Sequence, residues 1–314
     1  MTAKENTLAQ SGDPDPRAER ASAPIGVFDS GIGGLTTVRE LFTRLPRESV
    51  MYFGDTARLP YGNKSKDTIT RFSLEIASFL VRQRVKCIVV ACNTASSHAL
   101  ETLSDRFEVP VIGVIEPAAR AAVSASPRGR IGVVGTLATV GSNAFHDAIA
   151  RLAPRAVVQQ RACPLFVPLV EEGWLDHPVT RLVVEEYLAE LKGADLDSLI
   201  LGCTHYPLLA PLLRDTMGTG VKLVDSGAEA ARATAELLAA RGLLAPAAGG
   251  APRHHFFLSD EPRRRSFARV AESFLGRPLP PVSVVDQTDL PWFERAHDGP
   301  ARAATGEPVP SPPE

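Results

Sequence analysis

Residues 87–97 read Cys-Ile-Val-Val-Ala-Cys-Asn-Thr-Ala-Ser-Ser, a short apolar run that ends in a cysteine and passes into small polar residues. The apolar run has no polar alternation, which is typical of a strand buried on both faces of a parallel sheet. The polar residues that follow are rich in helix-capping types, so they predict the start of a helix. A strand that leads directly into a helix is half of a βαβ unit. The stretch therefore predicts an α/β fold with parallel strands.

The same alternation of short apolar runs and longer amphipathic ones recurs along the chain. Helices are predicted at Ser65–Arg84, Val179–Leu191 and Ala228–Ala240, where apolar residues recur at helical spacing. Ligands of open α/β sheets bind at the carboxyl ends of the strands, so residues just after strands are the candidate site residues. Strands are predicted at Ile25–Phe28, Val50–Phe53, Cys87–Ala91, Val111–Ile115, Ile131–Val134, Val157–Arg161, Ser198–Leu201 and Lys222–Val224.

A faint internal repeat divides the chain into two halves. In the first half, one strand ends in Asp29-Ser30-Gly31 and a later strand ends in Cys92. In the second half, one strand ends in Gly135-Thr136 and a later strand ends in Cys203. The simplest interpretation is two similar α/β lobes, each with one cysteine at the end of a strand. If the two lobes face each other, both cysteines lie in one cleft.

Composition limits the class of protein. The chain has 314 residues, so at about 150 residues per domain two domains are expected. The 34 basic and 36 acidic residues give a net charge of −2, which argues against a protein that coats nucleic acid or binds membranes through basic patches. No apolar run approaches the roughly 18–20 residues of a membrane-spanning helix, and the first residues lack the apolar core of a secretory signal. We therefore expect a cytoplasmic protein without membrane or nucleic-acid partners.

The two ends of the chain differ from its body. Residues 1–23 contain Asp-Pro-Asp-Pro and almost nothing large and apolar, which predicts a disordered arm. Residues 289–314 are rich in proline and predict a tail.

The four cysteines include no CxxC pair, so a disulfide framework is not expected, and a reducing cytosol fits best. Cys92 and Cys203 each follow a strand. Cys92 precedes a predicted helix start, and Cys203, with Thr204 and His205 next, is predicted to repeat this setting. The positive end of a helix dipole lowers the pKa of a thiol, so we expect thiolate character there. The alternative is that both are small buried apolar residues, which is the usual role of a cytosolic cysteine. Cys87 and Cys163 lack this context and are interpreted as structural.

Three further segments carry polar groups. The glycine-rich loop from Asp29 to Gly34 is no dinucleotide fingerprint, because Thr36 stands where the third glycine belongs, yet its N–H groups suit an anion such as a carboxylate. A tight turn capped by Asp29 explains the loop equally well. The loop 54–63 is either a surface connection or a segment that closes over a ligand. Residues 169–174 place two acids beside a predicted helix start or turn.

Several reaction types and metal sites can be weighed from the positions of the histidines, lysines and cysteines. His205 lies two residues from Cys203 and could tune that thiol or move a proton, whereas His254 and His255 begin a predicted strand and are interpreted as structural. Zinc would need four convergent ligands, and no phosphatase Cys-x5-Arg loop occurs. No lysine has a clear Schiff-base context, although Lys64 and Lys66 stay open. Two opposed thiols can remove a proton from one face of a carbon acid and deliver one to the other face.

Five segments together resemble one family, the cofactor-independent glutamate racemases of the aspartate/glutamate racemase superfamily. They occur in the family's order and span about residues 24–275. They are Ile25–Leu35 (IGVFDSGIGGL), Tyr52–Ser65 (YFGDTARLPYGNKS), Val89–Ser97 (VVACNTASS), Pro164–Gly173 (PLFVPLVEEG) and Leu199–Leu209 (LILGCTHYPLL).

The resemblance implies two pseudo-symmetric lobes, at 24–115 plus 225–288 and at 116–224, with no cofactor or metal and a homodimeric assembly. It implies that Cys92 handles the proton of D-glutamate and Cys203 that of L-glutamate, in a reaction that supplies D-glutamate for peptidoglycan. Asp29 would assist Cys92, while Glu171 and His205 would assist Cys203. Substrate contacts would come from Asp29, Ser30, Tyr61, Gly62, Asn93, Thr94, Thr204 and His205. Two alternatives stay open: a related two-cysteine enzyme such as an aspartate racemase, and a catalytically silent binding protein on the same scaffold.

Overall fold

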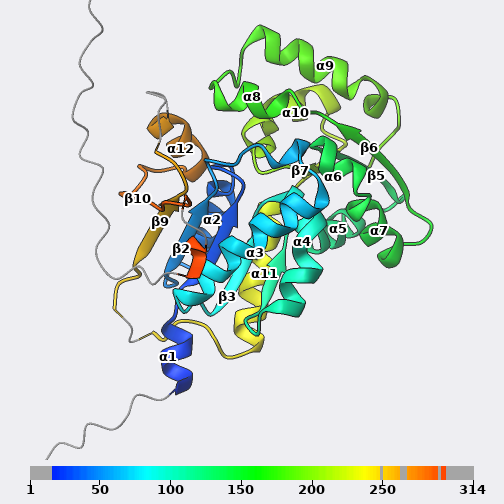
Figure 1. The fold of residues 1–314 in the computed structure, drawn as a ribbon. Coiled ribbons are helices and arrows are strands. Elements are labelled where there is room, and N and C mark those ends of the chain that lie inside the picture. The colour runs from blue at the N-terminus through cyan, green and yellow to red at the C-terminus, as the bar shows by residue number, and fades with distance from the viewer. Residues whose placement is uncertain (1–15, 248–249, 262–266, 289–290, 295–314) are drawn as a thin grey trace, which may run out of the picture.

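Two parallel sheets organise the molecule (Figure 1). The computed structural model describes residues 16–247, 250–261, 267–288 and 291–294. One sheet has the strand order β10-β9-β2-β1-β3-β4 and the other β6-β5-β7-β8, and every pair of neighbours is parallel. The strands are β1 (Ile25–Asp29), β2 (Val50–Gly54), β3 (Cys87–Val90), β4 (Val111–Gly113), β5 (Arg130–Gly135), β6 (Val157–Ala162), β7 (Ser198–Gly202), β8 (Lys222–Asp225), β9 (His254–Leu258) and β10 (Val282–Val284).

The predicted α/β class is confirmed, and the faint sequence repeat is visible in the topology. The orders β2-β1-β3-β4 and β6-β5-β7-β8 are the same arrangement of four successive strands. After β8 the chain returns to the first sheet and adds β9 and β10 beside β2. Of these two strands, the sequence pattern indicated only the one that begins at His254. The predicted lobe limits at 115/116 and 224/225 remain a prediction.

Burial of the strands differs between sheet centre and edge. β1, β2, β3 and β7 are buried along their whole length, as their unbroken apolar runs predict. β6 is at best half-buried along its length, because it forms an edge of the second sheet. The expectation of burial on both faces therefore holds for the inner strands and is wrong for the edge strands β6 and β8.

The helices run between strands, as βαβ units require. The three predicted helices are found as α3 (Lys66–Arg82), α9 (Pro178–Lys192) and α11 (Ser226–Ala240), and α3 begins where Ser65 caps the N–H of Thr68. The other helices are α1 (Pro16–Ser22), α2 (Leu35–Arg44), α4 (Asn93–Arg106), α5 (Ile115–Ser124), α6 (Leu137–Gly141), α7 (Ala144–Leu152), α8 (Phe166–Glu171), α10 (Ala210–Met217) and α12 (Phe267–Leu275), with 3-10 turns η1 (Tyr61–Asn63), η2 (Tyr206–Leu209) and η3 (Trp292–Glu294).

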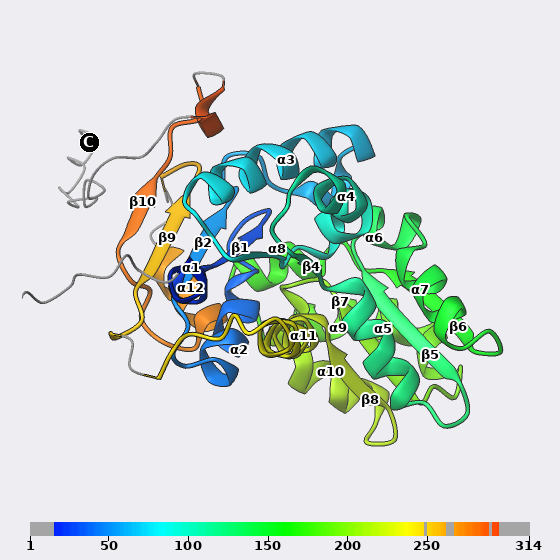
Figure 2. The same ribbon diagram turned by 90° about the horizontal axis from the view of Figure 1, so that it is seen from below.

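Helices cover both faces of the first sheet (Figure 2). Alternate side chains of β1 show the two layers, since Val27 packs in the core on the α2 and α11 side and Phe28 in the core on the α3 and α4 side. The core on the α2 and α11 side continues through α5 into the second lobe. The two sheets are therefore joined by one continuous apolar core, which positions the carboxyl ends of their strands relative to each other.

Both predicted ends of the chain contain ordered elements. Residues 16–22, within the predicted disordered arm, form α1, and the carbonyl of Ala21 accepts a hydrogen bond from the buried Lys86 ammonium. Lys86 is also paired with Glu48, so the contact satisfies a charge that would otherwise be buried alone. Within the predicted tail, Trp292 is buried against Phe53 and Phe79. Both expectations are wrong for these segments, and the rest of each end lies outside the described residues.

In the part of the chain that the structure describes, no helix has the length and apolar character needed to cross a membrane. The same residues contain no group of three or more His, Cys, Asp or Glu side chains that could hold a metal ion.

Candidate active site

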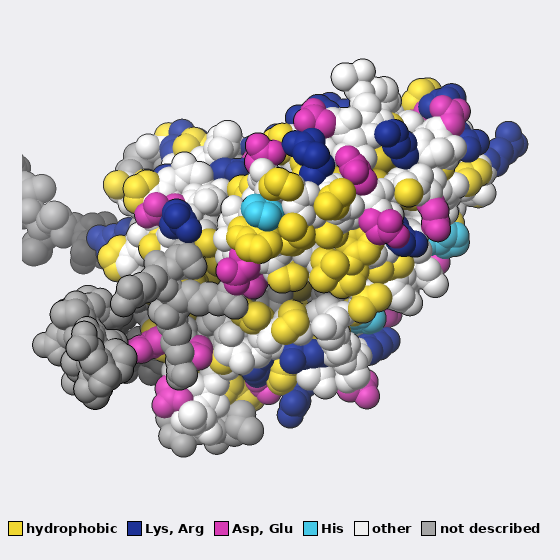
Figure 3. Space-filling model, turned by 90° about the horizontal axis from the view of Figure 1, so that it is seen from above, with side chains coloured by type: hydrophobic (Ala, Val, Ile, Leu, Met, Phe, Trp, Pro, Cys, Tyr) yellow, Lys and Arg dark blue, Asp and Glu magenta, His cyan; other side chains and the backbone are white. Residues whose placement is uncertain are grey.

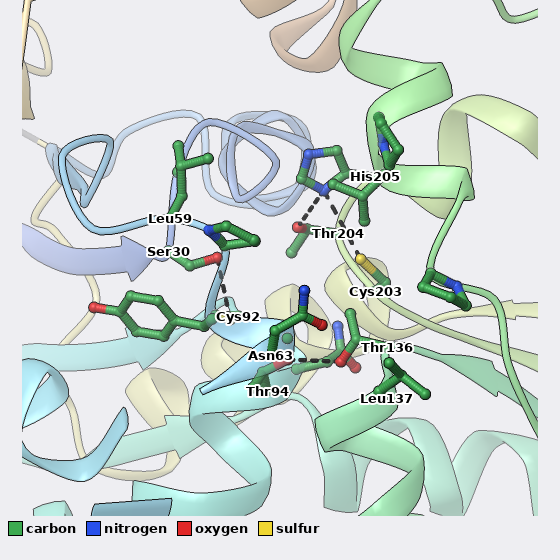
Figure 4. Close-up of a pocket in the computed structure, with 18 of the residues that line it drawn as sticks. Ser30, Leu59, Asn63, Cys92, Thr94, Thr136, Leu137, Cys203, Thr204 and His205 are labelled. Carbon is green, nitrogen blue, oxygen red and sulfur yellow. Dashed lines mark hydrogen bonds between the residues drawn. The ribbon is translucent and has the colours of Figure 1, made fainter. Parts of the chain in front are cut away.

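A cavity of about 400 Å³ lies at the carboxyl ends of β1, β3, β5 and β7. It brings together ten of the residues predicted from the sequence, and Figure 4 shows Ser30 and Cys92 on one side with Cys203, Thr204 and His205 on the other. The ten lining residues are Ser30, Tyr61, Gly62, Cys92, Asn93, Thr94, Glu171, Cys203, Thr204 and His205. Asp29, the eleventh, is fully buried behind the lining.

Cys92 occupies the N-cap position of α4, as the capping residues predict. Its sulfur accepts a hydrogen bond from the N–H of Ala95 at 3.4 Å and lies 3.6 Å from the hydroxyl of Ser30. The predicted helix start is therefore correct, and it places the thiol at the positive end of a fourteen-residue helix.

The expected net lowering of the Cys92 pKa is wrong in direction, although the N–H of Ala95 at the helix start acts in the expected sense. Burial, together with the nearby Asp29 carboxyl, raises the pKa of Cys92 to about 12, although the hydrogen bonds with Ala95 and Ser30 lower it. Desolvation disfavours the thiolate more strongly than two hydrogen bonds and a helix end favour it. Cys92 is consequently a protonated thiol in the unliganded protein.

Cys203 follows β7 and has different neighbours. No α-helix starts there, because a turn and the 3-10 segment η2 come next, so the expectation that Cys203 repeats the setting of Cys92 is wrong. Its sulfur lies 3.8 Å from Nδ1 of His205, and Nε2 of the same ring lies 3.2 Å from Oε1 of Glu171. Glu171 is the last residue of α8, not part of a helix start.

The His205 imidazole titrates far from its ordinary range. Burial lowers its pKa, but the hydrogen bonds with Cys203 and Glu171 and the charges of both groups outweigh burial and raise the pKa to about 10. The ring is therefore a cation at neutral pH, held between the sulfur and the carboxylate. Phe274 of α12 packs edge-on against it at a centroid distance of 5.1 Å.

Asp29, behind the cavity lining, and Thr204, within it, connect the two lobes. The hydroxyl of Thr204 lies 3.5 Å from Oδ1 of Asp29, and the N–H of Gly31 donates to Oδ2 at 3.0 Å. Burial raises the pKa of Asp29, and the charge of His205 and backbone hydrogen bonds lower it. Gly33 explains part of the glycine-rich loop, because a Cβ there would lie 2.3 Å from the Thr204 hydroxyl and 2.7 Å from the His205 ring.

Three hydroxyls form a closed cluster, of which Thr94 and Thr136 line the cavity and Thr139 is buried outside the lining. Thr94 lies 3.0 Å from Thr136 and 3.1 Å from Thr139, and Thr136 donates to Thr139 at 3.0 Å. Thr94 follows Cys92 in the first lobe, whereas Thr136 caps α6 in the second. The cluster therefore connects the lobes, and Figure 4 shows its contact between Thr94 and Thr136.

Several lining residues were not predicted as site residues. Thr136 ends the strand that the repeat pairs with Asp29-Ser30, so the repeat itself could have indicated it. Leu59, Leu137 and Leu165 line the cavity although each is at least 38% exposed. Figure 3 shows hydrophobic side chains gathered over the middle of one face of the molecule. No spacing pattern marks isolated apolar residues of this kind.

Other groups weighed from the sequence lie outside the cavity lining. Cys87 and Cys163 are buried, and burial raises the pKa of each thiol to about 12, which suits a structural role. Nδ1 of His254 accepts a hydrogen bond from the N–H of Val50, so that ring helps to join β9 to β2. Lys64 and Lys66 do not line the cavity.

A family model, a sequence relative and two of the similar solved structures match this chain, and all of them represent racemases. Residues 26–234 match the family model for Asp/Glu/hydantoin racemases. The chain is 53% identical over 255 residues to the glutamate racemase of Geobacter metallireducens, covering 81% of this chain and 93% of that protein. A glutamate racemase isoform from Bacillus anthracis has a TM-score of 0.80 at 39% identity over 84% of this chain and 97% of its own. A glutamate racemase from Francisella tularensis, solved with D-glutamate, has a TM-score of 0.79 at 38% identity over 85% and 99%.

Proposed function

Since this chain belongs to the Asp/Glu/hydantoin racemase family, we propose that it interconverts L-glutamate and D-glutamate by moving the α-proton between Cys92 and Cys203. The observation that carries the proposal is the position of the two sulfurs. They come from equivalent strand ends of the two lobes and line one cavity. A planar intermediate held between them would receive a proton on the face opposite the one that lost it.

In the direction from L- to D-glutamate, the Cys203 thiolate removes the α-proton. The Cα–H bond breaks, an S–H bond forms on Cys203, and the electron pair of the broken bond stays on the substrate. The Cys92 thiol then gives its proton to the opposite face of the α-carbon and becomes the thiolate. The reverse direction exchanges the two roles, which is general acid–base catalysis by a matched pair.

The protonation states of the free protein suit this direction. Cys92 is held as a thiol by burial, ready to donate a proton. His205, whose pKa is raised to about 10, places a cation 3.8 Å from the Cys203 sulfur. Glu171 holds the far nitrogen of the ring and fixes its orientation. Asp29, a neighbour of Cys92, would assist that thiol in the other direction.

Substrate binding would use the remaining lining groups. The N-terminal N–H groups of α4, at Asn93 and Thr94, suit a carboxylate, because the start of a helix favours anions. Hydroxyls of Ser30 and Thr204 and the Tyr61-Gly62 loop supply further polar contacts. An α-carbon of glutamate is a weak acid, so donors already in place must stabilise the negative charge that develops on the carboxylate during proton removal.

The cellular role extends the same proposal. We propose that the D-glutamate formed enters peptidoglycan synthesis and that the enzyme is a cytoplasmic homodimer. The four cysteines are all unpaired, which suits a reducing compartment. The dimer rests on the family resemblance, and light scattering on the purified full chain measures it directly.

The activity is tested by circular dichroism of L-glutamate incubated with the purified protein, without pyridoxal phosphate or metal added. We expect the optical signal to decay to zero, and L-aspartate in a parallel sample to keep its signal. Decay with aspartate alone would transfer the protein to aspartate racemases. Stable signals in both samples, together with saturable glutamate binding, would indicate the silent binding protein instead.

A further inference from the structure

One hydroxyl that does not line the cavity joins the two cysteine-bearing strand ends. Ser226 is the first residue of α11 and is 1% exposed. Its hydroxyl donates to the carbonyl of Leu201 in β7 at 2.9 Å, two residues before Cys203. The same oxygen accepts a hydrogen bond from the side-chain nitrogen of Asn93 at 3.1 Å, one residue after Cys92.

The donors and acceptors of this chain of contacts fix the orientation of the Asn93 amide. A hydroxyl carries a single proton, and a carbonyl can only accept, so the proton of Ser226 is committed to Leu201. The Ser226 oxygen must then accept from Asn93, and only the NH2 half of a side-chain amide can donate. The hydrogen-bond partners therefore require that Nδ2 of Asn93, and not Oδ1, faces Ser226.

This orientation leaves an unused acceptor beside the reaction site. Oδ1 of Asn93 is buried and has no hydrogen-bond partner among the described residues. Asn93 lines the cavity and is 2% exposed. A buried carbonyl oxygen without a partner is unfavourable, so a donor from the ligand is expected to fill it. Of the polar groups of glutamate at neutral pH, the carboxylates only accept, and the α-ammonium group is the donor.

We propose that Ser226 is a positioning residue, which holds the Asn93 amide so that Oδ1 accepts a hydrogen bond from the α-ammonium group of the substrate. The inference rests on the proposed function, because it assumes that glutamate binds in this cavity. Without the Ser226 hydroxyl, the amide is free to rotate by half a turn. It would then present NH2 to the ammonium group, which cannot accept a hydrogen bond.

The test separates the ammonium contact from the carboxylate contacts. Glutarate is the same dicarboxylate without the α-amino group, so its binding does not depend on which half of the Asn93 amide faces the ligand. We expect Ser226→Ala to raise the KM for D-glutamate by about tenfold, equivalent to about 1.4 kcal/mol, and to leave the inhibition constant of glutarate unchanged. Ser226→Thr, which keeps the hydroxyl, should restore the wild-type KM.

Thr234→Val is the matched control. Thr234 is a fully buried residue of the same helix whose hydroxyl donates to Ala230, away from the cavity. Its replacement should change neither constant. In an Asn93→Ala background, Ser226→Ala should not further alter the ratio of the KM for D-glutamate to the inhibition constant of glutarate. The side chain through which Ser226 acts is absent there.

An equal weakening of glutarate and D-glutamate by Ser226→Ala would overturn the proposal, as would an unchanged KM or a further change in the Asn93→Ala background. If Ser226→Ala does not give folded protein, Ser226→Cys, which is similar in size and a weaker donor, takes its place with the same expected direction. A wild-type protein that does not racemise glutamate overturns the proposed function and this inference together. A wild-type protein that does racemise it, with constants insensitive to Ser226, overturns this inference alone.

Discussion

The two strand ends that carry Cys92 and Cys203 occupy the same place in two sheets of the same order, yet their surroundings differ. Cys92 caps an α-helix beside the neutral hydroxyl of Ser30, close to a buried carboxyl group. Cys203 lies beside a histidine cation that is itself held by Glu171. The strand order is therefore the same in the two sheets, whereas the backbone after each cysteine and the charges around each sulfur differ.

This difference matters because a racemase must run equally well in both directions. The two enantiomers have the same free energy, so kcat/KM is equal in the two directions for any variant. The asymmetric surroundings therefore cannot favour one direction in kcat/KM, but they set the common rate and decide which protonation state of the cysteine pair the free protein adopts. The comparison of the two strand ends can be tested by changing one end at a time.

Loss of either sulfur should have the largest effect. Cys92→Ser and Cys203→Ser should each lower kcat/KM by about 10³-fold or more, because each removes the acid or base for one face of the substrate. Racemisation followed by circular dichroism measures this. Cys87→Ala, which changes a buried cysteine outside the cavity lining, should retain near wild-type activity. A serine variant with full activity would contradict the two-base account.

The partners of the two sulfurs should differ in importance. His205→Asn removes the cation beside Cys203 and should lower kcat by about 10²-fold. Ser30→Ala removes a neutral partner of Cys92 and should lower kcat by about tenfold or less. Steady-state kinetics on the two variants, side by side, give the comparison. Equal losses would mean that the two ends are chemically equivalent despite their different neighbours.

Gly33→Ala should disturb the Cys203 end without removing any functional group. The added Cβ would lie within 2.7 Å of both Thr204 and His205, so both side chains or the loop that carries residue 33 must shift. A small displacement of these groups should lower kcat by about tenfold while the fold is retained. Gly220→Ala is the control, because its Cβ would meet nothing within 4 Å. Unchanged kinetics in Gly33→Ala would show that the His205 position is not critical.

The pH dependence should report the His205 cation. Its pKa of about 10 lies above the ordinary 6.5, so its contribution to stability is complete below about pH 6.5 and is lost as the pH rises through about 10. For the same reason, kcat/KM should fall on the alkaline side. Glu171→Gln removes a charge that raises this pKa, so the alkaline limb should move to lower pH. A pH profile in which the limb stays in place would contradict the role of Glu171.

Local sequence patterns were sufficient for the parts of the site that one segment determines. An unbroken apolar run followed by capping residues predicted both β3 and the helix that starts after Cys92. The repeat predicted that Cys92 and Cys203 meet, because parallel strands in two lobes of one order expose equivalent ends.

Features that depend on segments far apart in the chain could not be predicted in this way. The direction of the Cys92 pKa shift follows from burial by neighbours that the local pattern does not show. The contact between Asn93 and Ser226 joins residues 133 positions apart. Trp292 is buried through contacts with Phe53 and Phe79, although its own segment is rich in proline.

The most direct test of two bases on two faces is the fate of deuterium at early conversion. Wild-type protein is incubated with L-glutamate in buffered D2O, and the α-deuterium content of each recovered enantiomer is measured by NMR. The account predicts that the D-glutamate formed carries solvent deuterium, whereas the remaining L-glutamate keeps its α-proton. The reason is that Cys203 removes the proton on one face and Cys92 delivers a solvent-derived deuteron on the other. Equal deuterium in both enantiomers from the start would point to a single base and contradict the account.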